Sequence, residues 1–485
     1  MMGWDLIVIL IVPFAVSVIC WWVPTRIARA LTLASGVLTF VLAVLLVPAK
    51  TTTALSGWLR VDALSVVFLV AVALVYGATA VFAIGYVHPA GDPGSAARYN
   101  RRFFAGLNLF AWAMAMAPVV NGLALLWVAI EVTTVVSALL VAIDDTDRAT
   151  EAAWKYVLIA SMGLGIGLLA TIIMYYAGST VFGNAYELFY PKVLSGAARF
   201  PPEVVRLSFV LAVLGFGTKM GLVPVHTWLP DAHSEAPTPI SALLSGSLLA
   251  VSFYAILRFY QVTARAIGPA FPRGVLLAFG VASLALAALY LASQRDLKRL
   301  LAYSSGEHRG VLAIGMSFSA PIAIVGVLLH VLAHAAAKSS AFFGAGSITR
   351  KFGTKDMSRI RGGIGALPWS GPMLVLAVLG LSAMPPFGIF RSEFLIVSGG
   401  LQDPRDAVAA VLVVGVTLAM LGLSWFTSRT MLTPSAEDSS RGEPSAWIVA
   451  SMVIGLAALA ILGVHPPGQL SDLLTRAAGE LGAQR

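Results

Sequence analysis

The sequence contains a single cysteine, Cys20, in 485 residues. One thiol cannot hold an iron–sulfur cluster and cannot form a disulfide within the chain. No nucleophile triad, nucleotide-binding loop or metal-ligand set is apparent either, so we assign no catalytic and no metal residue. Any redox chemistry must therefore belong to partner subunits.

Charged residues are also scarce, at 11% of the chain, whereas soluble domains carry about 25%. Hydrophobic residues make up 58%, and the mean hydropathy is +0.87. The net charge of +9 would suit nucleic acid in a soluble protein, but here Lys and Arg mostly occupy short loops at helix ends. The composition predicts an all-α polytopic membrane protein whose partner is the lipid bilayer and not nucleic acid.

Apolar runs of about 20 residues, the length needed to cross a bilayer, recur along the chain. No basic stretch or cleavage site precedes the first run, so we expect it to be retained. No soluble domain intervenes between the runs. We predict about 14 transmembrane helices, near 5–23, 28–48, 63–86, 103–119, 121–143, 153–178, 204–224, 238–260, 274–293, 297–318, 320–349, 371–399, 406–432 and 446–464.

Basic residues are more frequent in the loops after odd-numbered spans than after even-numbered ones. Loops with more Lys and Arg tend to face the cytoplasm. We therefore expect both termini on the non-cytoplasmic side. The odd-loop residues are Arg26, Arg29, Arg98, Arg101, Arg102, Arg295, Lys298, Arg299, Arg350, Lys351, Lys355, Arg359 and Arg361.

Two spans are interrupted, the seventh at 219–224 and the twelfth at 382–388. Paired broken helices in corresponding positions indicate inverted repeats around a midplane ion site. Because the breaks lie five spans apart, an odd number, the two units must have opposite topology. We divide the chain into a three-helix segment (1–102), a first five-helix repeat (103–260), a second (261–432), and a last helix with a short tail (433–485).

The seventh span contains Lys219, and a lysine at the centre of a membrane helix costs roughly 2.5–3.5 kcal/mol. Glu131 lies about ten residues into the fifth span, which is ~15 Å deep at 1.5 Å per residue. A Glu131–Lys219 pair could change its protonation at modest cost, as a gated proton relay requires. The alternative for Glu131 is a structural carboxylate that bonds a neighbouring helix.

The eleventh span carries HVLAHAAAK, whose spacing of four places His330, His334 and Lys338 on one helix face. Two histidines at this spacing suggest zinc, but no third ligand is apparent, and proton hopping suits them better. A buried structural hydrogen bond is the alternative for either ring. Glu393, after the second break, could end the proton path, with Arg391 as its counter-charge.

Several further residues are possible auxiliaries of this path. Lys298 could instead be a helix-end residue of the positive-inside kind, and the charges after the seventh span could be solvated loop residues. Glu307 and His308 form a dense ionisable cluster with Arg309 that we expect to face the interior. The auxiliary set is His226, Asp231, Glu235, Ser245, Lys298, Glu307, His308 and Arg391.

These motifs resemble the antiporter-like membrane subunits of respiratory complex I, multi-subunit cation/proton antiporters and group 4 hydrogenases. The resemblance covers roughly residues 100–400 and rests on Glu131, GTKMGLVPVHTWLPDAHSEAPTPISALL, QRDLKRLLAYSS, HVLAHAAAK and the PPF break. EAAWKY, SEAPTPISALLSG and RDLKRLLAYSSGEH look most like the F-type membrane component of hydrogenase-4 and formate hydrogenlyase-like complexes.

The resemblance implies two inverted five-helix repeats and proton translocation driven by redox chemistry elsewhere. It also implies a bacterial or archaeal cell membrane, further antiporter-like and anchor subunits, and peripheral cytoplasmic subunits that hold any Fe–S or Ni–Fe centres. This chain itself is expected to hold no cofactor. Glu131 and Lys219 match the family's Glu–Lys pair, His330 and His334 its central histidines, and Glu393 its terminal ionisable position.

The chain departs from the family at two positions. Several relatives have His or Lys in place of Ser245, which implies that water fills the link between the half-paths. Arg309 replaces an apolar residue, often methionine, and its charge could tune or block the second half-path. A cation/proton antiporter subunit that needs no redox partner, and a non-pumping structural subunit, are the alternative functions.

Overall fold

The computed structural model describes residues 3–86, 93–404, 406–434 and 441–482, so parts of the predicted loops near 87–102 and 433–445 lie outside it. The described chain is helical almost throughout, with one antiparallel hairpin of β1 (Thr52–Ala54) and β2 (Leu59–Val61). The helices of the first half are α1 (Trp4–Ile19), α2 (Thr25–Leu45), α3 (Ala63–Tyr86), α4 (Pro93–Val119), α5 (Leu123–Val141), α6 (Asp147–Phe182), α7 (Tyr190–Gly196), α8 (Pro202–Met220), α9 (Leu229–Glu235), α10 (Thr238–Leu243) and α11 (Leu249–Ile267). Those of the second half are α12 (Ala270–Leu291), α13 (Leu297–Ser317), α14 (Pro321–Phe352), α15 (Gly363–Ala366), α16 (Ser370–Leu381), α17 (Gly388–Gly400), α18 (Asp406–Met431), α19 (Ala446–Val464) and α20 (Gly468–Glu480).

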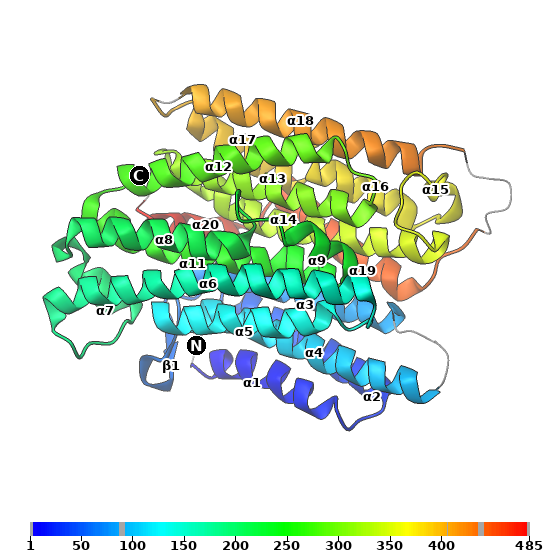
Figure 1. The fold of residues 1–485 in the computed structure, drawn as a ribbon, viewed down its shortest axis with the longest axis horizontal. Helices are drawn as coiled ribbons and strands as arrows, with labels where there is room; N and C mark the ends of the chain where they lie inside the picture. The colour runs from blue at the N-terminus through cyan, green and yellow to red at the C-terminus, as the bar shows by residue number, and fades with distance from the viewer. Residues whose placement is uncertain (1–2, 87–92, 405, 435–440, 483–485) are drawn as a thin grey trace.

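Ten helical segments of the described chain are long and apolar enough to cross a membrane. Large apolar side chains such as Leu139, Met162 and Trp154 are exposed on their outer surfaces, where lipid would cover them. The helices lie side by side along the long axis, with β1, α7 and the C-terminus towards one end and α15 towards the other (Figure 1). The prediction of an all-α polytopic membrane protein is confirmed.

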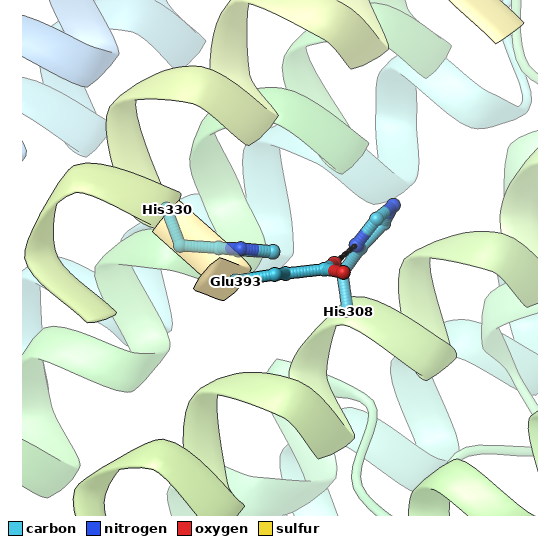
Figure 2. Close-up of side chains that lie close together, drawn as sticks. All are labelled: His308, His330 and Glu393. Carbon is cyan, nitrogen blue, oxygen red and sulfur yellow. Dashed lines mark ion pairs between the residues drawn. The ribbon is translucent and has the colours of Figure 1, made fainter. Parts of the chain in front are cut away.

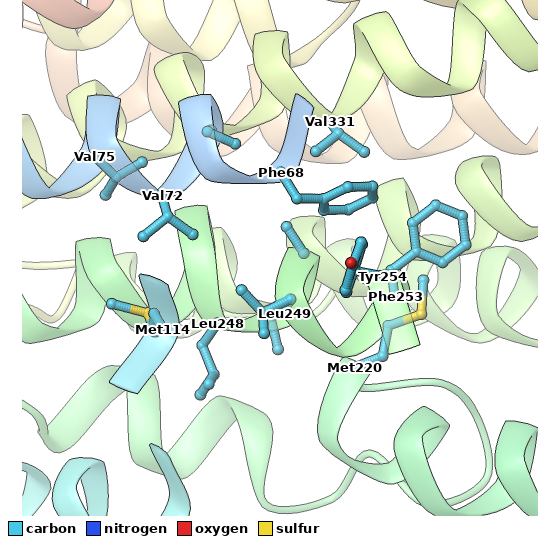
Figure 3. Close-up of a cluster of buried hydrophobic side chains, with 14 of the residues drawn as sticks. Phe68, Val72, Val75, Met114, Met220, Leu248, Leu249, Phe253, Tyr254 and Val331 are labelled. Atoms are coloured by element: carbon cyan, nitrogen blue, oxygen red, sulfur yellow. The ribbon is translucent and has the colours of Figure 1, made fainter. Parts of the chain in front are cut away.

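The core of the bundle is built by α3, α10, α11 and α14. Every residue in the most apolar window of 238–267 is buried, whereas only 22% of the corresponding window of α18 is buried. Phe68 of α3 packs against Phe253 and Tyr254 of α11, with ring centroids 6.3 and 5.2 Å apart (Figure 3). Helices that are buried on most of their surface thus occupy the centre, and helices buried on one side face outward.

Both predicted helix interruptions are present. Helix α8 ends at Met220, and Gly221 follows with φ +86°, a left-handed conformation that glycine adopts without strain. The chain then forms the short helix α9 before α10 begins at Thr238. A single π-helical turn, Leu244–Leu248, joins α10 to α11. The second interruption separates α16 from α17.

Helix α20 is fastened to the start of α3 by hydrogen-bonded polar groups. The Glu480 carboxylate accepts hydrogen bonds from the backbone N–H groups of Ala63 and Leu64, both at 3.0 Å. Beside it, Arg258 of α11 donates to Asp62, the residue before α3, at 2.6 Å. Because the first N–H groups of a helix lack partners within the helix, Glu480 completes the N-terminus of α3 from a distant part of the chain.

We expect the attachment of α20 to depend on pH. Burial, with a contribution from the nearby Asp62 charge, raises the pKa of Glu480 from 4.5 to about 7. Attached α20 therefore binds a proton more readily than detached α20, so attachment should weaken as pH rises from about 5 to 8. Hydrogen–deuterium exchange of residues 468–480, corrected for intrinsic rates, should show this loss of protection in the parent protein and not in Glu480→Gln.

Glu203→Gln, at an exposed position of α8, is the matched control and should keep the parental pH dependence. An identical pH dependence in Glu480→Gln and the parent would contradict the assignment to Glu480.

Candidate functional site

Glu131 and Lys219 lie at the interface of α5, α6 and α8. Glu131 is half-buried; its Oε1 accepts a hydrogen bond from Ser161 at 3.3 Å, while its buried Oε2 has no protein partner. Lys219 is fully buried, and its Nζ donates to Thr134 at 2.7 Å and to the Tyr156 hydroxyl. The ammonium also lies 4.6 Å from the centre of the Tyr156 ring.

The two predicted gate residues therefore face each other without a direct ion pair. No Lys219–Glu131 contact within 4.0 Å occurs, although their charges attract each other over a longer distance. Thr134 is three residues from Glu131, so both side chains lie on the same face of α5. A short movement of the ammonium along this face would bring it from the threonine hydroxyl to the carboxylate.

The π-helical turn connects this region to the second interrupted half. Ser245 lies in the turn, and its hydroxyl is 2.7 Å from that of Ser305 on α13. Its carbonyl accepts from Arg309 at 3.1 Å, and the same guanidinium nitrogen lies 3.2 Å from Nδ1 of His334. Arg309 thus bridges α10–α11 and α14 at the point where the sequence predicts a link.

His330, His334 and Lys338 all lie on α14 and are fully buried, as the spacing predicts. Lys338 donates to the Leu301 carbonyl at 2.7 Å and to Ser304 at 2.5 Å. Nδ1 of His330 is 2.9 Å from the Ser392 hydroxyl. This face of α14 is therefore bonded to α13 on one side and to α17 on the other.

His308 lies on α13 at the centre of the second half, where its side chain faces α14 and α17. Its ring centroid is 5.1 Å from that of His330 and 4.9 Å from that of His334. Its Nε2 is 3.4 Å from Glu307 Oε2. Its Nδ1 is 3.9 Å from Glu393 Oε1, and Figure 2 shows this approach. The prediction that Glu307 and His308 face the interior is confirmed, because they are 3% and 0% exposed.

Ligand atoms of His308, His330 and Glu393 all lie within 4.8 Å of one another. The structure thus groups three residues that could bind a metal, a grouping that the sequence alone does not reveal. A zinc ion bonds nitrogen at about 2.0–2.1 Å, so two of its nitrogen ligands can be no more than roughly 4.2 Å apart. The one separation among these atoms given above, 3.9 Å between His308 Nδ1 and Glu393 Oε1, is inside this limit, so the spacing fits a shared ion as well as a proton site.

Arg391 is not the counter-charge of Glu393, and this prediction is wrong. Its Nη1 lies 3.3 and 3.4 Å from the carbonyls of Gly463 and Val464, at the end of α19. Residues two apart on a helix point about 200° away from each other, so the two side chains of α17 cannot share one face.

The charged residues after α8 belong to the helix α9 and not to a solvated loop. Asp231 forms ion pairs with Lys155 and Arg299, and Glu235 pairs with Lys355 at 2.7 Å. They line a surface cleft of about 270 Å³ together with other paired charges. His233 is fully buried.

Two other auxiliaries lie at the two ends of α9. Lys298 is buried and donates to the carbonyl of Ala236 at 2.7 Å, so it ties the start of α13 to the end of α9. His226 lies in the α8–α9 connection, half-buried, with its ring 6.5 Å from that of Tyr290.

Sequence reasoning missed the neutral side chains that hold these charged groups. Thr134, Tyr156, Ser161, Ser304 and Ser392 each hydrogen bond a residue of the site. Helical spacing from Glu131 could have identified Thr134. The others are contributed by different helices, so no local pattern indicates them.

Comparisons with known proteins identify the family and the fold of the chain. Residues 120–422 match the family model described as NADH:quinone oxidoreductase/Mrp antiporter, TM. The chain is 36% identical over 363 residues to a hydrogenase-4 component F homolog of Methylacidiphilum infernorum, covering 74% of this chain and 76% of that one. It is 30% identical over 447 residues to the NADH-quinone oxidoreductase subunit N of Desulforudis audaxviator, covering 86% and 85%. Its fold matches a chain of the Mrp complex from Dietzia sp. DQ12-45-1b with a TM-score of 0.86 at 18% identity, covering 99% and 98%.

We expect Arg309 and Arg258 to differ in their effect on stability. Arg309 has no carboxylate within ion-pair distance in the described chain, and its buried Nε and Nη1 lack hydrogen-bond partners. Arg309→Met should leave the free energy of unfolding unchanged or raise it by about 1–4 kcal/mol. Arg258→Met leaves Asp62 buried without its partner and should lower it by about 3–5 kcal/mol. Thermal unfolding in detergent measures both, and equal destabilisation would contradict this difference.

Proposed function

The chain belongs to the NADH:quinone oxidoreductase/Mrp antiporter transmembrane family, and we propose that it is the proton-translocating membrane subunit of a hydrogenase-like oxidoreductase complex. The proposal rests on the row of ionisable side chains that runs through the inside of the bundle from Glu131 to Glu393. They lie on α5, α8, α13, α14 and α17, whose other buried residues are apolar, small or hydroxyl-bearing. Such groups are costly inside a membrane and mark ion pathways.

The gate of the first half would be Lys219. In the described state its ammonium is held by the neutral oxygens of Thr134 and Tyr156, and not by the Glu131 carboxylate. A charge change at a partner interface would move the ammonium towards or away from Glu131 and so alter the proton affinity of both. Moving one charge against 100 mV takes about 2.3 kcal/mol. A movement of the ammonium would change the proton affinity by a free energy of this size.

The second half would carry the proton through Lys338, His334, His330 and His308 to Glu393. The His308 ring nitrogens are 3.4 Å from Glu307 and 3.9 Å from Glu393. These separations exceed a hydrogen bond or are at its limit, so transfer requires small side-chain rotations or bridging water. Arg309 places a fixed positive charge beside His334. That charge would bias the movement of a proton along α14.

The assembly would contain other membrane subunits of the same family, and peripheral redox subunits that hold the Fe–S or Ni–Fe centres. We propose fourteen membrane helices, counting α8, α13, the interrupted α16–α17 and the shorter α1 with the ten apolar spans. The two five-helix repeats, 103–260 and 261–432, would have opposite topology. Both termini would lie on the non-cytoplasmic side of a bacterial or archaeal cell membrane, where α20 would lie.

We expect Glu131→Gln to abolish proton translocation while assembly and electron transfer persist, because the amide cannot ionise. Proton uptake by vesicles containing the assembled complex, and its redox turnover, are the two measurements. Glu187→Gln, at an exposed loop position, is the control and should pump normally. Unchanged proton uptake in Glu131→Gln would sink the proposal and favour a structural subunit.

A cation/proton antiporter subunit is the second candidate, favoured by the fold's match to the Mrp complex. Such a subunit would act without a redox partner. The proteins that co-purify with the chain distinguish the two functions: large redox subunits support the first, and small antiporter subunits alone support the second.

A further inference from the structure

A second surface cleft has arginine as its only kind of charged lining residue. It has a volume of about 630 Å³, and its charged lining residues are Arg295, Arg361 and Arg429, with no acidic residue among them. Arg295 follows α12, Arg361 follows α14, and Arg429 is in the last turn of α18. Three separate segments therefore direct positive charge to one place.

These arginines differ from other basic residues on the same surface. In the neighbouring cleft four basic and four acidic residues alternate, and most of them are paired with each other. Arg295, Arg361 and Arg429 make no ion pair with any described carboxylate. Asp356 acts on Arg295 at longer range, but it hydrogen bonds Ser358 and pairs with Arg359 at 3.6 Å. The charge of the arginine cleft is therefore available to an external anion.

The position of the cleft favours a lipid as the source of that anion. It lies between the ends of α12 and α18, both of which are apolar enough to span a membrane. Trp425, one turn before Arg429, is 61% exposed, and its ring lies 5.9 Å from the Arg429 guanidinium. Tryptophan is enriched at the headgroup level of bilayers. The apolar side chains of Met357 and Ile360 also line the cleft.

We propose that Arg295, Arg361 and Arg429 form a binding site for the phosphate headgroup of an anionic phospholipid. Guanidinium groups bind phosphate oxygens in pairs, and a cleft of this size accepts a glycerophosphate headgroup. Basic pockets between membrane helices on the cytoplasmic side are known binding sites for such headgroups. A bound lipid would hold together the ends of α12 and α18 and the segment after α14.

The test is binding of a labelled phosphatidylglycerol to the purified full-length protein in neutral detergent. Each arginine replaced by glutamine should weaken binding about fivefold, and the triple variant on the order of a hundredfold. The triple lysine variant keeps the charge and should bind within about tenfold of the parent. Arg359→Gln, an exposed and ion-paired neighbour outside the cleft, should bind like the parent.

Phosphatidylcholine and inorganic phosphate distinguish the possible sources of the anion. Neither should displace phosphatidylglycerol from the parent protein. Displacement by inorganic phosphate would overturn the lipid assignment in favour of a soluble anion. Parental affinity in the triple glutamine variant would overturn the site. Loss of a partner subunit from the triple variant's complex, with lipid binding unchanged, would assign the cleft to a protein contact instead.

Discussion

A charge inside a membrane protein must find a partner within the protein, and this constraint organises the whole bundle. Three buried cations of the site, Lys219, Lys338 and Arg309, are held by hydroxyl, carbonyl and imidazole groups. Arg258, in contrast, is held by a carboxylate. Neutral acceptors satisfy donors without cancelling the charge, so the field of the path cations extends to their neighbours. The Asp62 carboxylate cancels the charge of Arg258, so this pair holds helices together and lies outside the path.

The two halves of the site use this constraint differently. Around Lys219, the contacts come from α5 and α6 and leave Glu131 with an unbonded oxygen. Around His308, ring and carboxylate groups approach each other without direct hydrogen bonds. The first arrangement suits one group that moves over a short distance, and the second suits several groups that exchange a proton. Arg309 lies between them and contacts both the π-helical turn and His334.

Much of this organisation could be predicted from the sequence, because membrane burial makes isolated polar residues conspicuous. Depth in an apolar run identifies Glu131 and Lys219, and a four-residue spacing identifies the buried face of α14. The approach of His308 to Glu393 could not be predicted, since it depends on how α13 and α17 rotate about their axes. The Arg391 pairing was wrong because it relied on proximity in sequence and neglected helical geometry. Helix α9 was missed because its seven residues, with Pro230 in the first turn, carry too little periodicity.

The contact of Glu480 with Ala63 joins residues 417 positions apart. During synthesis, α3 therefore enters the membrane long before the carboxylate that completes its N-terminus exists. Until α20 is made, Asp62 alone serves the first turn of the central helix. The last hydrogen bonds at the start of the central helix therefore form only after residue 480 has been synthesised.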